Sequence, residues 1–125
     1  MSNLEIKVTR HHCSGKDVAV ISLKGILDTL TRRELEKTTQ DLLAENIAHY
    51  IFDLTEVTSA ESTGIGFLIK LVADVQGQHG GVVVIGASAR LKTACDLVGL
   101  WGYVFLADNL EHALELVLNE SHRRI

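Results

Sequence analysis

Residues 51–70 decide the fold of this chain: they read Ile51-Phe-Asp-Leu-Thr-Glu-Val-Thr-Ser-Ala-Glu-Ser-Thr-Gly-Ile-Gly-Phe-Leu-Ile-Lys70. The first residues are apolar up to an aspartate, which is typical of a buried central strand. Apolar residues then recur at Ile65, Leu68 and Ile69, which is helical spacing. Ser62 lies between the two patterns. We therefore expect Ser62 in a small polar loop at a helix start, beside free backbone N–H groups.

Strand patterns flank this stretch on both sides. Alternating residues at Leu4–Arg10 and Val18–Lys24, separated by a turn at residues 14–17, predict an antiparallel hairpin. His49–Asp53 and Val82–Ile85 are short and continuously apolar, which predicts parallel central strands. Tyr103–Leu106 is expected to be the last strand.

Helical patterns lie between the strands. Thr31 and Glu34 form a predicted capping box, with Leu30 and Leu35 as its hydrophobic staple, for a helix that runs to about Glu45. Its apolar face is marked by Leu35, Thr39, Leu42 and Leu43. Ser88 is expected to cap a third helix, and Asp108 with Glu111 to begin a fourth, which frays from Glu120.

These elements predict an α/β fold in one domain, residues 1–125. The expected architecture is a mixed sheet of about five strands with about four helices, an N-terminal antiparallel hairpin followed by alternating helix and strand.

Composition limits the function. The chain of 125 residues is 46% hydrophobic and carries a net charge of −4 spread over both signs, which argues against a nucleic-acid partner. No window approaches the roughly 18 apolar residues of a membrane span, so we expect a cytoplasmic protein without direct membrane insertion. Two cysteines indicate neither a disulfide framework nor a zinc site.

Catalytic motifs fit poorly. Gly64 and Gly66 begin like a dinucleotide-binding fingerprint, but Ile69 occupies the third glycine position. Ser88 lacks the closing glycine of a nucleophile elbow. His11, His12 and Cys13 are metal-ligand types, but neighbouring strand residues point to opposite faces and no second cluster matches them. We expect no enzyme activity, no cofactor and no metal.

Four segments resemble a known family. Gly25-Ile-Leu-Asp28, Asp53-Leu-Thr-Glu-Val57, Glu61-Ser-Thr-Gly-Ile-Gly66 and Leu97-Val-Gly-Leu100, in this order of elements, closely resemble a STAS domain of the anti-sigma factor antagonist family. In that family the serine of an Asp-Ser-Ser-Gly or Asp-Ser-Thr-Gly segment is the phosphorylation site, which implies Ser62 here. This chain has Glu61 where aspartate is usual.

The resemblance implies a partner switch. The unphosphorylated protein would bind an anti-sigma factor that is also a serine kinase, and so release a sigma factor. Phosphorylation of Ser62 would end the binding, and a PP2C-like, metal-dependent serine phosphatase would restore it. The expected partner-binding residues are Asp28, Asp53, Glu61, Ser62, Thr63, Gly64, Ile65, Phe67, Leu68 and Leu71.

Several alternatives stay open. Ser62 serves equally as a helix cap, and Thr63 is a second candidate hydroxyl. Gly64 and Gly66 fit either close packing of the helix or the approach of a partner. The wide apolar arc that includes Phe67 and Leu71 fits either burial or a partner-facing surface. A non-switching STAS adaptor or scaffold subunit, in a signalling assembly or a membrane transporter, is the alternative function.

Overall fold

Five strands form one sheet in the computed structural model, which describes residues 3–60, 62–76, 80–98 and 104–119. The strand order is β1-β2-β3-β4-β5, the same as the order along the chain. The strands are β1 (Leu4–Cys13), β2 (Lys16–Leu27), β3 (His49–Ala60), β4 (Gly81–Ile85) and β5 (Val104–Ala107). The helices are α1 (Thr29–Ala44), α2 (Ser62–Gln76), α3 (Ala89–Val98) and α4 (Leu110–Asn119). The predicted α/β fold is confirmed.

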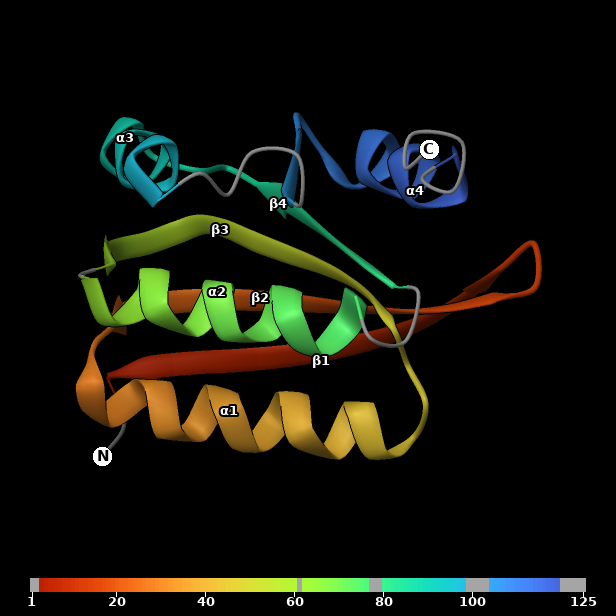
Figure 1. The fold of residues 1–125 in the computed structure, drawn as a ribbon, viewed down its shortest axis with the longest axis horizontal. Coiled ribbons are helices and arrows are strands. Elements are labelled where there is room, and N and C mark those ends of the chain that lie inside the picture. Colours follow the sequence, from red (N-terminus) through yellow and green to blue (C-terminus); the bar gives the residue numbers. More distant parts are fainter. Residues whose placement is uncertain (1–2, 61, 77–79, 99–103, 120–125) are drawn as a thin grey trace.

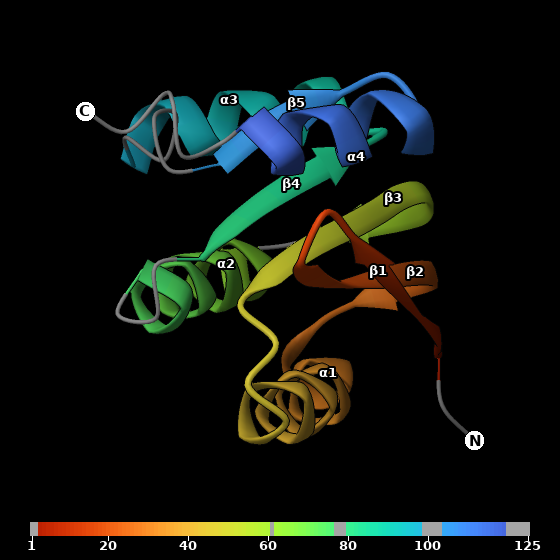
Figure 2. The same cartoon turned by 90° about the vertical axis from the view of Figure 1, so that its right-hand side faces the viewer.

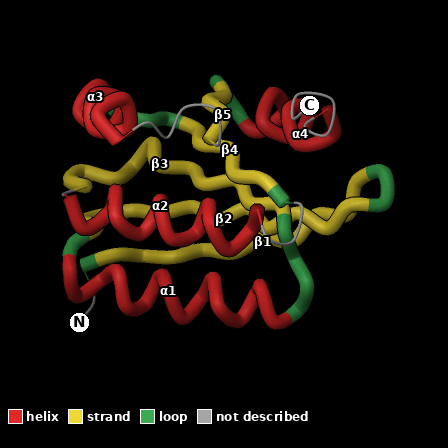
Figure 3. The backbone as a smooth tube through the Cα atoms, viewed as in Figure 1, coloured by secondary structure: helices red, strands yellow, loops and turns green. Residues whose placement is uncertain are grey.

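The first two strands form the predicted antiparallel hairpin, with Cys13 paired to Lys16 at its tip. Its two turn residues, Ser14 and Gly15, have φ angles of 49° and 80°. Positive φ at both positions belongs to the tight hairpin turn whose twist matches that of the strands. The turn projects beyond the helices in Figure 3.

The other neighbouring strands are parallel. Figure 1 shows α1 and α2 side by side along the sheet, and Figure 2 shows β4 between α2 and α4. The helices accordingly cover two separate apolar cores. One contains Leu35 of α1 and Leu71 of α2 against Phe52, and the other contains Val117 of α4 against Val83.

The strand β3 is longer than expected, because the predicted polar loop after Asp53 is wrong. Residues 54–60 continue as strand and pair with β2 as far as Ala60. The register shifts between Ser22 and Lys24 and again between Gly25 and Ile26. At each shift β3 contributes an extra residue, so these polar residues are accommodated as bulges against a long partner strand.

Two predicted helix caps are also wrong. The N-cap of α1 is Asp28, and Thr31 occupies the N3 position of its capping box, which leaves Leu30 exposed instead of in a staple. At α4 the side chain of Asn109, not Asp108, accepts a hydrogen bond from the His112 N–H at 2.9 Å. Aspartate is a stronger N-cap than threonine, so α1 begins earlier than expected. The cap of α4 lies one residue later than expected, at Asn109, and asparagine caps a helix as well as aspartate does. Ser88 directly precedes α3, and its carbonyl accepts from Lys92 N–H at 2.9 Å.

Candidate functional site

Two helices begin at the same edge of the sheet. The Cα atoms of Leu27 and Ala60 are register partners at the ends of the parallel strands β2 and β3. Asp28 follows Leu27 directly as the N-cap of α1, and α2 begins at Ser62. The carboxyl ends of two neighbouring strands therefore bring Asp28 and Ser62 to one edge.

The carboxylate of Asp28 is held by its own helix. Its Oδ1 accepts from the backbone N–H groups of Leu30 and Thr31, both at 3.0 Å. The Asp28 N–H donates in return to Thr31 Oγ1 at 2.8 Å. The hydrogen bond from the Thr31 N–H is the main cause that lowers the pKa of Asp28. A carboxylate therefore stands at this edge at neutral pH, and capping alone explains its presence.

The predicted modification segment forms the first turn of α2. Ser62, Thr63, Gly64 and Ile65 are its first four residues, so the expectation that Ser62 marks a helix start is confirmed. Glu61 lies outside the described residues.

Most of the apolar arc of α2 belongs to the core. Phe67 is 2% exposed, Leu68 4% and Leu71 2%. These three side chains pack against the sheet with Phe52, which favours burial over a partner-facing surface for this part of the arc. Ile69, at 44% exposure, is the large apolar side chain that the described part of α2 presents to solvent. Helical spacing puts Ser62, Gly66 and Ile69 on one face.

The outer faces of α1 and α2 are joined by charged side chains. Arg32 Nε lies 3.4 Å from Glu36 Oε1, and Lys70 Nζ lies 3.4 Å from Glu36 Oε2. We call this set the Arg32–Glu36–Lys70 bridge. A Cβ atom added to Gly66 would lie 3.1 Å from Arg32 Nη1. Gly66 thus lets the guanidinium lie close to the backbone of α2, which favours the packing role of this glycine.

Asp53 is not part of the same cluster. Its Oδ1 accepts from the backbone N–H of Thr55 at 3.0 Å and from the Thr55 hydroxyl at 2.5 Å. Ala60 comes seven residues after it along the strand, a distance on the order of 20 Å. Asp53 supports the first bulge of β3 and lies far from the start of α2.

Sequence reasoning missed three exposed or half-buried residues near this edge. Ile26 and Leu30 are 37% and 73% exposed, and Arg32 is the residue against Gly66. Leu30 falls outside the apolar spacing of Leu35 and Leu42, which was the available signal. Nothing in the sequence pattern singled out Arg32, because its position follows from how α1 and α2 pack.

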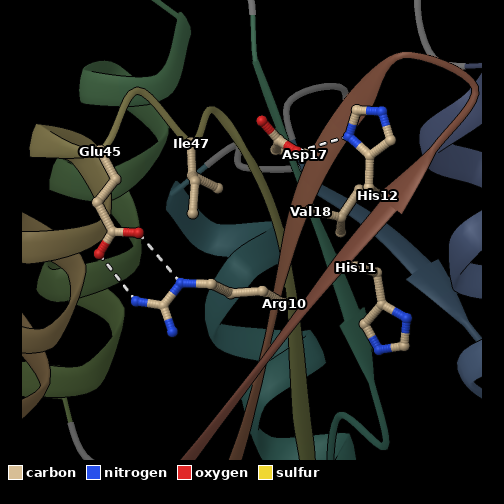
Figure 4. Close-up of a pocket in the computed structure, with 7 residues that line it drawn as sticks. All are labelled: Arg10, His11, His12, Asp17, Val18, Glu45 and Ile47. Atoms are coloured by element: carbon tan, nitrogen blue, oxygen red, sulfur yellow. Dashed lines mark hydrogen bonds and ion pairs between the residues drawn. The ribbon is translucent and has the colours of Figure 1, made fainter.

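A concave region with a volume of about 290 Å³ lies at the opposite end of the strands. Figure 4 shows Arg10 reaching Glu45 and His12 reaching Asp17 across it. The Arg10–Glu45 bonds are 3.1 and 2.8 Å, and the His12–Asp17 distance is 2.7 Å. These polar side chains thus pair with one another. In the described part of the chain, no three His, Cys, Asp or Glu side chains gather as a metal site would require.

The chain matches a protein family over most of its length. The family model described as "Mlab, STAS domain" covers residues 13–116. The chain therefore belongs to the STAS-domain family. Of the helices in the described ranges, none has the length and apolar character needed to cross a membrane.

Solved structures share the fold. An anti-sigma factor antagonist from Mycobacterium paratuberculosis is 25% identical, with a TM-score of 0.68 over 91% of this chain and 95% of that chain. The Bacillus cell fate determinant SpoIIAA in its phosphorylated form is 17% identical, with a TM-score of 0.71 over 90% and 99%. The anti-sigma factor antagonist SpoIIAA in its unphosphorylated form is 14% identical, with a TM-score of 0.69 over 93% and 96%.

Proposed function

We propose that this protein is an anti-sigma factor antagonist that works by partner switching. In its unphosphorylated form it binds an anti-sigma factor that is also a serine kinase, and this binding releases a sigma factor. Phosphorylation of Ser62 ends the binding. Thr63 is the less favoured acceptor. The protein itself performs no catalytic step, and we place it in the cytoplasm as a single STAS domain, residues 1–125.

One observation carries this proposal: Ser62 opens a helix at the sheet edge that also holds the Asp28 carboxylate. The adjoining surface offers apolar side chains, with Ile69 on α2 and Leu30 on α1 exposed. Mixed apolar and charged surface of this kind suits a protein partner. The structural likeness to the anti-sigma factor antagonist from Mycobacterium paratuberculosis supports the same role.

A phosphate at Ser62 fits a switch that acts on the surface. The first N–H groups of α2 and its dipole tolerate a negative group, so the fold survives the modification. The phosphate adds about −1.5 to −2 charge beside Asp28, and a partner would have to desolvate it there. A cost of roughly 3 kcal/mol lowers affinity more than a hundredfold.

The chemistry belongs to the partners. The kinase transfers the γ-phosphoryl group of ATP to the Ser62 hydroxyl oxygen, and ADP and the hydroxyl proton leave. A PP2C-like serine phosphatase adds water to the ester and returns serine and inorganic phosphate. The remaining proposed contact residues are Glu61, Gly64 and Ile65, with Asp53 as a more distant member.

The test uses three baits in lysate of the native host: Ser62→Ala, Ser62→Asp and Ser88→Asp. Ser88 is a matched control because it is an exposed serine directly before a different helix, α3. We expect a kinase-type anti-sigma factor on the Ser62→Ala and Ser88→Asp baits and its loss from Ser62→Asp. Phosphosite mapping after incubation with the recovered kinase and ATP should then identify Ser62. If all three baits retain the anti-sigma factor equally, the proposed switch is wrong.

A second candidate function is a non-switching STAS subunit of a larger assembly, such as a membrane transporter. The observation that favours it is Glu61, because this chain lacks the aspartate that precedes the phosphorylated serine in the segment it resembles. In that case all three baits would retain the same assembly, and Ser62 would act only at the helix start.

A further inference from the structure

The α1 and α2 helices are aligned with a constant offset. Glu36 and Lys70, which contact each other, are 34 residues apart. Arg32 and Gly66 have the same separation and also lie together. Both helices start at one sheet edge and run away from it side by side (Figure 1). The offset therefore puts Ser62 level with Asp28, one turn before the Arg32–Gly66 contact.

This alignment puts a guanidinium within reach of Ser62. Residues four apart on a helix have Cβ atoms about 5–6 Å apart, so Ser62 and Gly66 are neighbours on the helix surface. Arg32 Nη1 would lie 3.1 Å from a Cβ atom at Gly66. A phosphoserine side chain extends by several ångströms beyond its Cβ atom, and arginine is long and flexible. A phosphate on Ser62 and the Arg32 guanidinium can therefore meet above Gly66.

Arg32 already contacts Glu36, but replacing this carboxylate by a phosphate on Ser62 is favourable because the phosphate carries more negative charge. Glu36 offers Arg32 one negative charge across a long 3.4 Å contact and is also bound by Lys70. A phosphate offers about −1.5 to −2 charge and three acceptor oxygens, and the guanidinium fork matches it in geometry. Lys70 remains to compensate Glu36 when Arg32 moves. The Arg32–Glu36–Lys70 bridge thus contains a cation that can be released without leaving an unpaired carboxylate.

We propose that Arg32 is the phosphate-binding residue of the modified protein, exchanging Glu36 for the phosphate on Ser62. This inference rests on the proposed phosphorylation of Ser62. It adds a second effect of modification besides repulsion: the contact between α1 and α2 is rearranged on the surface that a partner would meet. Among the residues that the structure describes, the charged groups at this end of the two helices are Asp28, Arg32, Glu36 and Lys70, and Glu61 directly precedes Ser62 in the sequence.

The test needs no kinase. Phosphoserine is installed at position 62 during translation, and the phosphate is titrated by ³¹P NMR in the otherwise unchanged chain and in an Arg32→Gln variant. The ordinary second pKa of phosphoserine is about 6. Because a nearby cation favours the dianion, we expect the phosphate pKa to rise by about half a unit when Arg32 is replaced. Arg32→Lys should give an intermediate value, since it keeps the charge and loses the fork.

The matched control is Arg33→Gln, which removes the same charge from the neighbouring, exposed position of α1. It should change the phosphate pKa much less than Arg32→Gln. Equal shifts in the two variants would overturn the inference, because the effect would then be general charge screening. If the two arginine variants shift the phosphate pKa equally but the Ser62→Asp bait still loses the kinase, the proposed function stands and only the role of Arg32 is overturned. If the phosphate pKa depends on Arg32 but the Ser62→Asp bait retains its partner, the contact between Arg32 and the phosphate is supported and the switch is overturned.

Discussion

Leu27 and Ala60 are register partners at the last positions of two parallel strands, and a helix follows each of them. This pairing places the Asp28 cap and the Ser62 helix start at one edge. The pairing depends on two bulges in β3, which carry the strand past the point where β4 ends. The candidate site is therefore a product of sheet register more than of any single motif.

Surface and core residues of α2 should separate cleanly in mutagenesis. Phe67→Ala removes a side chain that is 2% exposed, and we expect a loss of about 3–5 kcal/mol in the free energy of unfolding. Ile69→Ala, at 44% exposure, should change it by no more than about 0.5 kcal/mol while weakening capture of the kinase. Urea denaturation measures the first effect. A large loss of stability in Ile69→Ala would contradict this assignment of the helix faces.

Asp28 should make stability depend on pH in the acidic range. Its pKa is lowered in the folded state, chiefly by the Thr31 N–H, so its stabilising contribution is present above the ordinary value of about 4. The contribution is lost as the pH falls through the lowered pKa. Asparagine can cap the helix but carries no titratable group, so Asp28→Asn should lose less stability than the wild type as the pH falls through this range. Thermal unfolding between pH 7 and 2.5 checks this, with Asp96→Asn on α3 as control. Parallel curves for wild type and Asp28→Asn would refute it.

The connection after α1 should depend on one buried hydroxyl. Tyr50 is fully buried, and its hydroxyl donates to the Ile47 carbonyl at 2.7 Å. Tyr50→Phe keeps the ring stacked with Phe52 but leaves that carbonyl without this donor. We expect a loss of about 1 kcal/mol in the free energy of unfolding by urea titration. An unchanged midpoint would show that the hydroxyl contributes nothing.

Burial also raises the pKa of Tyr50. Ionisation then favours the unfolded chain, so this tyrosine lowers stability as the pH rises above about 10. That part of the alkaline loss should disappear in Tyr50→Phe. Thermal unfolding between pH 8 and 11 measures it.

Gly86 should tolerate substitution less well than Gly15. Both have positive φ, 73° and 80°, but an added Cβ at Gly86 would lie 2.9 Å from the Thr55 Cα while Gly15 faces open space. We expect Gly15→Ala to cost about 1–2 kcal/mol and Gly86→Ala about 2–4 kcal/mol. Paired denaturation curves separate backbone strain, common to both, from the clash. Equal costs would mean that the Thr55 bulge moves freely.

The periodic segments of the sequence predicted the fold well. Continuous apolar runs such as Val82–Ile85 have one stable location, between two helix layers, and this strand is buried throughout. The polar run after Asp53 predicted a loop where the structure has a strand, because a strand that is bulged and pairs with a single long neighbour needs no apolar alternation. The apolar arc of α2 did not show whether its side chains face the core or a partner, since both roles require apolar residues. The position of Arg32 against Gly66 could not be predicted, because Gly66 belongs to another helix and the contact follows from how the two helices pack.

The identical order of strands in the sheet and along the chain has a consequence for synthesis. Each strand pairs with the one made just before it, so the loops to be closed are the shortest that parallel pairing allows. The hairpin of β1 and β2 emerges first and offers an edge to β3, which in turn offers one to β4. Folding can thus follow the ribosome strand by strand, with the start of α2 assembled well before the last helix has been translated.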